Sequence, residues 1–276
     1  MINRVYEVVQ SYLYKHREPT FSDGKDFYIF KSFNINILRK FKYCWIVNEY
    51  EGFDFIREKK IGDKFRKVGL NFTLNFFANN NLDDFLKILT VTIDDPINLD
   101  VTKYHTKYSN KILKDFDIVI FVANHGRDLG AHKKTLSYLK SLSLDENMPV
   151  ILSNSSFVPD IKIINLDFLS LISNRLPILI GASYSFGPKY YLLKRRHLQS
   201  FYLVGSLFNL SLIFSKVSFK NNCKDHVIRC GELYIEHVCR MIGIKYLVCY
   251  DGFIFNIWRP GQWSLKFYDH RLKCNN

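Results

Sequence analysis

Two short polar segments, residues 124–130 and 153–156, combine side-chain types that bind small polar ligands. The first contains an amide, a guanidinium and a carboxylate, and the second contains three hydroxyls and an amide. Each segment directly follows an apolar, largely β-branched run, at 118–123 and 149–152, which is typical of a buried parallel strand. The side chains that we expect to contact a ligand are Asn124, Arg127, Asp128, Ser153, Asn154 and Ser155.

Open α/β sheets bind ligands in the crevice at the carboxyl ends of their parallel strands. Because both polar segments follow strands of the same expected sheet, we expect them to line one crevice. This arrangement favours a small-molecule site, and a nucleotide is the ligand that we predict. Asp128 also has two structural alternatives, since its carboxylate can pair with Arg127 or cap the helix that follows.

The sheet that must hold these segments is predicted from the pattern of apolar residues. In the first half of the chain we expect strands at 43–47, 70–77, 118–123 and 149–152, and helices at 53–68, 82–89 and 131–142. Strands that alternate with helices imply an α/β fold with a mainly parallel sheet, flanked by helices and joined by right-handed crossovers. A polar connector is expected at 90–109 and a short helix at 109–114.

The two ends of the chain have less regular patterns. We expect helices at 1–17, 168–172 and 232–241, and strands at 177–181, 197–204 and 245–250. These elements suggest an N-terminal helical lead-in at 1–42, a ligand-binding α/β part at 43–160 and a smaller C-terminal part at 161–276. No low-complexity linker separates the parts, so we expect one continuous domain.

The chain is basic, with 39 Lys and Arg against 26 Asp and Glu and a formal net charge of +13. This balance favours polyanionic partners, which are nucleotide phosphates, anionic lipid headgroups or nucleic acid. The basic residues are dispersed and no recognised nucleic-acid-binding motif is present, so we do not expect a nucleic-acid partner. Aromatic and basic residues alternate at 258–273, which suits an anionic membrane surface, although nucleic acid or packing on the same domain also fits.

The cysteines and the apolar segments indicate the compartment. The N-terminus lacks the apolar core of a signal peptide, so we expect reduced thiols in the cytoplasm. His226, Cys230, His237 and Cys239 lack the close C-x-x-C pairs of structural zinc sites, and we predict no metal site there. No window reaches the ~20 uninterrupted apolar residues of a membrane span.

Three segments, in this order, resemble one known family. Gly126-Arg-Asp-Leu-Gly-Ala131 is similar to the G-R/Y-D-x-G-A turn of the rhamnan-synthesis F family of bacterial glycosyltransferases. Residues 152–159 resemble that family's L-N-D-S-x-F-G-P segment, and residues 197–204 resemble its H-L-Q-S-Y/F-F-L-V strand. Residues 231–236 are similar to a helix that begins with Glu in the family. The agreement covers roughly residues 115–250, or half of the chain.

The resemblance implies a GT-A-like enzyme with a Rossmann-like sheet for a nucleotide-sugar and a smaller C-terminal acceptor side. Such enzymes build capsule, O-antigen or rhamnan on a glycan or lipid-linked acceptor, at the inner face of the cytoplasmic membrane. In that sheet, the strand ends near Asn48, Glu49 and Asn79 would contact the base and ribose, with ordinary loop polarity as the alternative. On the expected strand at 197–204, His197 and Gln199 share one face and would meet the donor sugar or the acceptor.

The chain departs from the family at Asn154, where the family has Asp and the usual GT-A enzyme has Asp-x-Asp to hold a divalent metal. An amide and hydroxyls are poor ligands for Mg or Mn, and Asp117 precedes a strand at the opposite edge. We therefore predict no firm cofactor besides the nucleotide-sugar, with basic residues that stabilise the leaving diphosphate. Arg195 and Arg196 are candidates for that role, and a solvated basic loop is their alternative.

An inverting transfer also needs a general base near the acceptor hydroxyl. Glu232 is the first candidate because it opens a helix after a glycine, although it can simply stabilise that helix N-terminus. Glu236 follows one turn later on the same side, and Asp128 is the third carboxylate that we assign to catalysis. Two further functions stay open, which are an inactive relative that acts as a scaffold and, less favoured, a basic nucleic-acid-binding protein.

Overall fold

The computed structural model describes residues 27–31, 38, 40–61, 64–94, 107, 115–159, 169, 172, 177–181, 184–185, 197–219, 227–250 and 253–256. The helices expected at 1–17 and 109–114, the cations Arg195 and Arg196, and the aromatic tail at 258–273 lie outside these residues. Most of the short helix expected at 168–172 also lies outside them.

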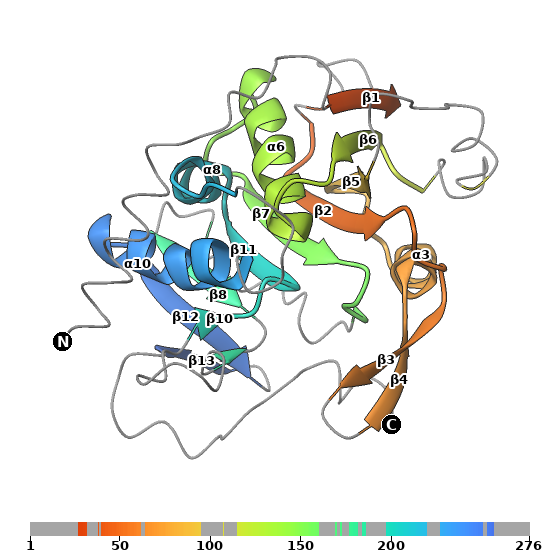
Figure 1. The fold of residues 1–276 in the computed structure, drawn as a ribbon. Helices are drawn as coiled ribbons and strands as arrows, with labels where there is room; N and C mark the ends of the chain where they lie inside the picture. Colours follow the sequence, from red (N-terminus) through yellow and green to blue (C-terminus); the bar gives the residue numbers. More distant parts are fainter. Residues whose placement is uncertain are drawn as a thin grey trace.

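Nine of the described strands form one sheet at the centre of the molecule, in the order β1-β6-β5-β2-β7-β11-β8-β12-β13 (Figure 1). Two smaller pairs, β3 with β4 and β9 with β10, lie outside this sheet. The strands of the large sheet are β1 (Phe27–Lys31), β2 (Tyr43–Tyr50), β5 (Phe85–Ile93), β6 (Ile118–Ala123), β7 (Pro149–Asn154), β8 (Ile178–Gly181), β11 (Tyr202–Ser206), β12 (Lys245–Tyr250) and β13 (Phe253–Asn256). The smaller pairs consist of β3 (Arg57–Ile61), β4 (Lys64–Val68), β9 (Tyr184–Ser185) and β10 (His197–Leu198).

The central part of the sheet is mostly parallel, as predicted. Strands β6, β5, β2 and β7 are parallel neighbours, and β8 is parallel to β12. Strand β11 runs antiparallel between β7 and β8. The chain passes from β2 outward to β5 and β6 and then returns to the other side of β2 as β7. This reversal between β2 and β7 is a topological switch point, where α/β sheets bind ligands at the carboxyl ends of the strands.

Helices cover both faces of the sheet (Figure 1). Helices α6 (Arg127–Ser141), α8 (Leu207–Ser215) and α10 (Leu233–Met241) pack on one face, and α3 (Leu70–Asn79) packs on the other. Side chains alternate between the two cores along each strand, as in β2, where Ile46 joins the first core and Trp45 the second. Of the described strands in residues 161–276, β8, β11, β12 and β13 extend the same sheet as those of the first half, and β9 and β10 form a separate pair.

Several expected elements are confirmed. Strands occupy 43–50, 118–123, 149–154, 178–181 and 245–250, close to the predicted ranges. The helix expected at 131–142 begins earlier, at Arg127, so part of the predicted polar turn is its first helical turn. The helix expected at 232–241 begins with a π-helical turn, η1 (Ile228–Glu232), and continues as α10.

Three consecutive predictions in the first half were wrong. Within the range 53–68, where we expected a helix, the strands β3 and β4 pair antiparallel as a hairpin. The sequence Gly62-Asp63 that separates them is one that two-residue hairpin loops favour. Residues 70–77 belong to helix α3, which buries Leu70, Thr73 and Phe77 at helical spacing, where we expected a strand. The nearly fully buried strand β5 (Phe85–Ile93) occupies most of the range 82–89, where we expected a short helix. It continues into the start of the range 90–109, where we expected a polar connector.

Two other predictions also need correction. Residues 27–31 of the lead-in, which we expected to be helical, form β1 and pair antiparallel with β6. The strand expected at 197–204 is interrupted after Leu198, because β10 pairs with β9 and only β11 joins the large sheet. Gln199 lies in the turn between them, so it does not share a strand face with His197.

Candidate functional site

The two polar segments predicted from the sequence meet at the carboxyl edge of the parallel strands. The amide of Asn154, at the end of β7, donates a hydrogen bond from Nδ2 to Oδ2 of Asp128, in the first turn of α6, over 2.8 Å. The Oδ1 atom of Asn154 accepts a hydrogen bond from the backbone N–H of Ser156 at 3.0 Å. Asn154 therefore holds the two segments together beside the switch point.

The backbone before Asp128 is held in an unusual conformation. Gly126 and Arg127 have positive φ angles of 82° and 54°, a region that residues with a side chain rarely adopt. A Cβ atom on Gly130 would lie 1.6 Å from the carbonyl oxygen of His125, so only glycine fits there. Both glycines of the G-R-D-x-G-A sequence are thus needed to turn the chain tightly into α6, and this turn directs Asp128 toward β7.

A second carboxylate, Glu232, reaches the same place from η1. Its Oε1 atom accepts a hydrogen bond from the backbone N–H of Ser200 at 2.9 Å, and the hydroxyl of Ser200 donates to Oδ2 of Asp128 at 3.0 Å. The other oxygen of Glu232 lies 3.3 Å from Nε2 of the buried His197. The result is a connected polar group of five residues from four segments far apart in the sequence, which we call the carboxylate cluster: Asp128, Asn154, His197, Ser200 and Glu232.

The environments of the two carboxylates shift their pKa values in opposite directions. Burial raises the pKa of Asp128, and the nearby charge of Glu232 adds to this rise, against hydrogen bonds from Asn154 and Ser200 that lower it. Burial also disfavours the charged form of Glu232, but the bonds from His197 and Ser200 outweigh it and lower the pKa of Glu232. Pairs of carboxyl groups whose pKa values are separated in this way are typical of acid–base chemistry.

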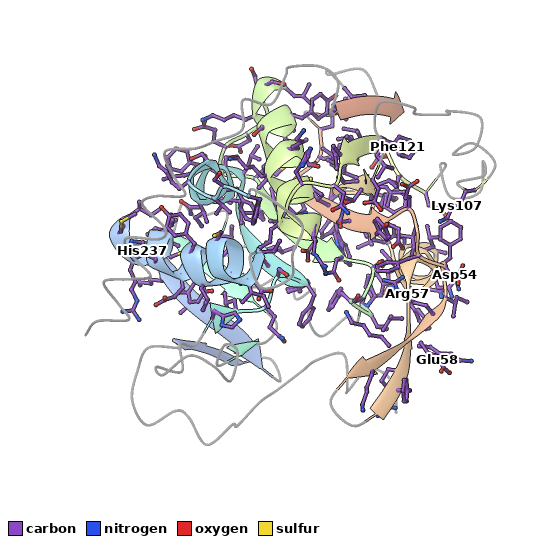
Figure 2. All side chains as sticks on the ribbon, in the orientation of Figure 1. Asp54, Arg57, Glu58, Lys107, Phe121 and His237 are labelled. Carbon is purple, nitrogen blue, oxygen red and sulfur yellow. The ribbon has the colours of Figure 1, made fainter. Side chains whose placement is uncertain are left out.

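A cationic region adjoins the cluster on the side of β2. Ser155 and Ser156 follow β7, and their hydroxyls accept hydrogen bonds from Nη2 of Arg57 at 2.8 Å and Nζ of Lys59 at 2.9 Å. Both cations belong to β3 of the hairpin, and Figure 2 shows Arg57 where the hairpin joins the body of the molecule. The carboxyl edge therefore carries two carboxylates connected to Asn154 directly or through Ser200, and two cations on the serines that follow Asn154.

Glu49 lies beside Arg57 and is completely buried. Its Oε1 atom accepts hydrogen bonds from the hydroxyl of Ser155 at 2.8 Å and the backbone N–H of Tyr50 at 2.9 Å, and it lies 3.7 Å from Arg57. Its Oε2 atom has no hydrogen-bond partner. Burial raises the pKa of Glu49 to about 7, although the charge of Arg57 and the bond from Ser155 partly oppose this rise.

Other predicted site residues have structural partners at the sheet edge. The amide of Asn48 is buried and donates to the carbonyl of Thr90 and the hydroxyl of Thr92, and Ser153 accepts a hydrogen bond from the indole of Trp45. Asn124 donates to Asp94 over 2.6 Å at the end of β6. Arg127 is exposed beside Asp128, and Gln199 is half-buried next to Ser200.

Two further predicted residues, Asn79 and Glu236, have no hydrogen bond to the cluster or to the cations beside it. Asn79 is the exposed last residue of α3, so the prediction that it ends a strand at the ligand crevice was wrong. Glu236 forms an ion pair with Arg240 of the same helix at 2.6 Å and has no hydrogen bond to the residues of the cluster. Asp117 precedes β6 and accepts a hydrogen bond from the backbone of Lys87, at the opposite edge of the sheet as expected.

The sequence reasoning missed three residues of the site. Ser200 belongs to the His-Leu-Gln-Ser segment that carried part of the resemblance, but we read that segment as an unbroken strand. Arg57 and Lys59 lie in the range 53–68, where the sequence predicts a helix and no site residue. The Gly62-Asp63 sequence is the signal that would have indicated a hairpin there and hence two faces.

The donor set does not fit a resident divalent metal of the GT-A type. Asp128 is the one carboxylate that contacts Asn154 among the described residues, and the Oδ1 atom of Asn154 is already used by Ser156. The hydroxyl of Ser153 already accepts a hydrogen bond from Trp45, so it is not free to replace the second carboxylate of an Asp-x-Asp pair. The described residues also contain no group of three or more His, Cys, Asp or Glu side chains that could hold a metal.

No protein-family model matches the chain, and no curated protein matches it. Within the part of the chain that the structure describes, no helix is long and apolar enough to cross a membrane.

Proposed function

We propose that the chain is a GT-A-like glycosyltransferase that moves a sugar from a nucleotide-sugar to a glycan or lipid-linked acceptor in bacterial surface polysaccharide synthesis. The observation that carries this proposal is the carboxylate cluster, in which Asp128 and Glu232 meet across Ser200 at the switch point of a mostly parallel sheet. A Rossmann-like α/β sheet is compatible with a GT-A fold. The sequence resemblance at 126–131, 152–159 and 197–204 points to the same class, and these segments supply Asp128, Asn154, His197 and Ser200.

An inverting sugar transfer needs a base for the acceptor hydroxyl and a negative charge near the sugar ring, and the two carboxylates can supply these. The acceptor oxygen forms a bond to the anomeric carbon while the bond to the nucleoside diphosphate breaks and its electron pair leaves with the diphosphate. The raised pKa of Asp128 makes it the better acceptor for the hydroxyl proton. Glu232, which His197 keeps ionised, stabilises the positive charge that develops on the sugar ring.

The leaving diphosphate needs positive charge, and the hairpin cations can supply it without a metal. Arg57 and Lys59 contact the hydroxyls of Ser155 and Ser156, directly after the position where the related family has its acidic residue. A guanidinium can bind two phosphate oxygens at once, and an ammonium adds a compact charge. Buried or partly buried cations act more strongly than solvated ones because water screens them less.

A scaffold function without catalysis is the second candidate, and Asn154 is the observation that favours it. An amide stands where a metal-binding carboxylate is expected, so a chain that has lost its chemistry would carry this change. A scaffold would bind the donor weakly or not at all and would not turn it over. We rank it below the enzyme because the cluster retains two carboxylates with opposite pKa shifts.

The test is a thermal-shift panel of UDP-, GDP-, dTDP- and CMP-sugars, each with and without Mn²⁺, followed by transfer or hydrolysis assays with any donor that binds. A ligand that binds the native state raises the melting temperature, by mass action. We expect one nucleotide class to raise it without Mn²⁺, and Asp128→Asn to lower turnover by about 10²–10⁴-fold while the protein stays folded. No shift with any nucleotide-sugar would refute the enzyme, and binding without turnover would favour the scaffold.

A further inference from the structure

The β3–β4 hairpin has two faces of different character. The register pairs Glu58 with Lys67 and Lys60 with Phe65, and alternation along the strand puts Ile56 on the same side as Glu58. We call this side, which consists of Ile56, Glu58, Lys60, Phe65 and Lys67, the outer face. All five residues are exposed. Figure 2 shows Glu58 on the side of the hairpin away from the body of the molecule.

The outer face carries two large exposed apolar side chains, Ile56 and Phe65. Phe65 is 66% exposed and Ile56 is 51% exposed. Among the described residues, five large apolar side chains are exposed, and three of them, at positions 53, 56 and 65, belong to this hairpin and the turn that precedes it. The other two, Phe208 and Met241, lie on α8 and α10. Exposed apolar side chains gathered on one element mark interaction surfaces more often than isolated ones.

Charge is concentrated in the same element. Residues 57–68 contain six basic and two acidic residues in the sequence, and on the outer face Lys60 and Lys67 flank Phe65. Basic residues around exposed apolar side chains suit the surface of a bilayer, where the apolar groups enter the headgroup region and the cations meet anionic lipids. We propose that the outer face docks the protein on an anionic membrane surface.

Two other partners, single-stranded nucleic acid and a second copy of this chain, fit the side chains of the outer face less well. Single-stranded nucleic acid binds to stacking platforms of aromatic rings, and Ile56 offers no ring for a base to stack on. A second copy of this chain would bring the like charges of two hairpins together, because residues 57–68 carry an excess of four basic over acidic residues. An anionic lipid surface satisfies both the charge and the apolar side chains.

The opposite face of the hairpin, which we call the inner face, carries Arg57 and Lys59 and connects the docking surface with the candidate site. Arg57 and Lys59, which alternate with the outer residues along β3, point to Ser155 and Ser156 at the carboxyl edge of the sheet. A hairpin docked by its outer face therefore holds the site beside the membrane surface. The docking itself requires neither a donor nor an acceptor, so it can be tested independently of the proposed transfer.

The test measures sedimentation of the full chain with vesicles of phosphatidylcholine alone and with vesicles that also contain phosphatidylglycerol. We expect binding to the mixed vesicles only. The double variant Lys60→Ala/Lys67→Ala should lower the partition coefficient by about fivefold per lysine, and Ile56→Ser/Phe65→Ser should lower it by on the order of tenfold. The matched controls are Lys140→Ala/Lys245→Ala, which removes the same charge from exposed sites elsewhere, and Phe208→Ser. These controls should bind as the wild type does.

Each other result would overturn the proposal. Equal losses in the control variants would mean that net charge, and not this face, drives binding. Absence of binding to mixed vesicles would exclude the membrane, and a shift of a single-stranded RNA that depends on Phe65 would assign the face to nucleic acid. Concentration-dependent self-association that Phe65→Ser abolishes, without vesicle binding, would assign it to a second copy. Circular dichroism of every variant checks that the fold is kept.

Discussion

Asp128 and Glu232 accept hydrogen bonds from the same residue, Ser200, the first from its hydroxyl and the second from its backbone N–H. The charge of Glu232 raises the pKa of Asp128, so the two ionisations are coupled. Replacing Glu232 by Gln removes that charge and should lower the pKa of Asp128. Because Asp128 acts as a base only when deprotonated, the acid limb of the pH–rate profile should move to lower pH. Carboxyl NMR titration of Asp128 measures the same change without activity, and an unmoved titration would contradict the coupling.

Ser200→Ala should have the opposite effect on Asp128. The hydroxyl bond from Ser200 lowers the pKa of Asp128, so its loss should raise that pKa and move the acid limb to higher pH. The backbone bond to Glu232 is kept in this variant. The two substitutions thus predict shifts of opposite sign for one carboxyl group, and two shifts in the same direction would show that the variants disturb the fold around Asp128.

Because of the buried Glu49, we expect the free energy of unfolding to fall as the pH rises. Its pKa is raised to about 7 in the folded protein, above the ordinary value of 4.5. The native state therefore binds the proton more tightly, and the stability that this provides is present below about 4.5 and is lost as the pH rises through about 7. Glu49→Gln keeps an oxygen that accepts from Ser155 and Tyr50 and cannot ionise. It should remove this loss, which is on the order of 3 kcal/mol, in urea unfolding measured from pH 4 to pH 8. Glu146→Gln, at an exposed site, is the control.

Because of the buried His132, we expect an opposite contribution, in which the free energy of unfolding falls as the pH is lowered. Its ring is fully buried on α6, neither nitrogen has a hydrogen-bond partner, and burial lowers its pKa to about 3. A lowered pKa contributes stability that is present above the unfolded value of 6.5 and is lost as the pH falls toward about 3. His132→Leu should make the acid side of the stability profile flatter and raise the free energy of unfolding, because a buried polar group without a partner is removed. An unchanged acid limb, compared with the exposed-site variant His125→Leu, would contradict this.

The parts of the fold that the sequence predicts well are those in which burial alone decides the pattern. The runs at 118–123 and 149–152 are apolar without interruption because both faces of their strands are covered, and both strands are predicted closely. The same rule applies to β5, but the prediction divides this strand between a short helix at 82–89 and a polar connector that begins at Thr90. Alternation misled us at 70–77, where the helix buries only every third or fourth residue against Trp45 and its neighbours.

The contacts of the candidate site also fall into two groups, those that the sequence predicts and those that it does not. The contact of Asp128 with Asn154 follows from the rule that parallel strands end at one edge, so the sequence predicts it. Ser200, Arg57 and Lys59 join the site through a break between β10 and β11 and through a hairpin between β2 and α3. Such long-range placements depend on which strands pair, and local periodicity carries no information about that pairing.

Lys59 and Lys60 offer a test that separates the two faces of the hairpin. They are neighbours in β3, but Lys59 donates to Ser156 whereas Lys60 lies opposite Phe65 on the outer face. Lys59→Ala should weaken the binding of inorganic pyrophosphate and of the nucleotide-sugar by about tenfold and make that binding less sensitive to salt, since one charged contact is lost. Lys60→Ala removes the same charge and should leave this affinity unchanged in the absence of membranes. Isothermal titration at two salt concentrations measures both effects. Equal weakening in the two variants would mean that phosphate responds only to the general positive charge of the hairpin, and the assignment of Lys59 to the site would then be wrong.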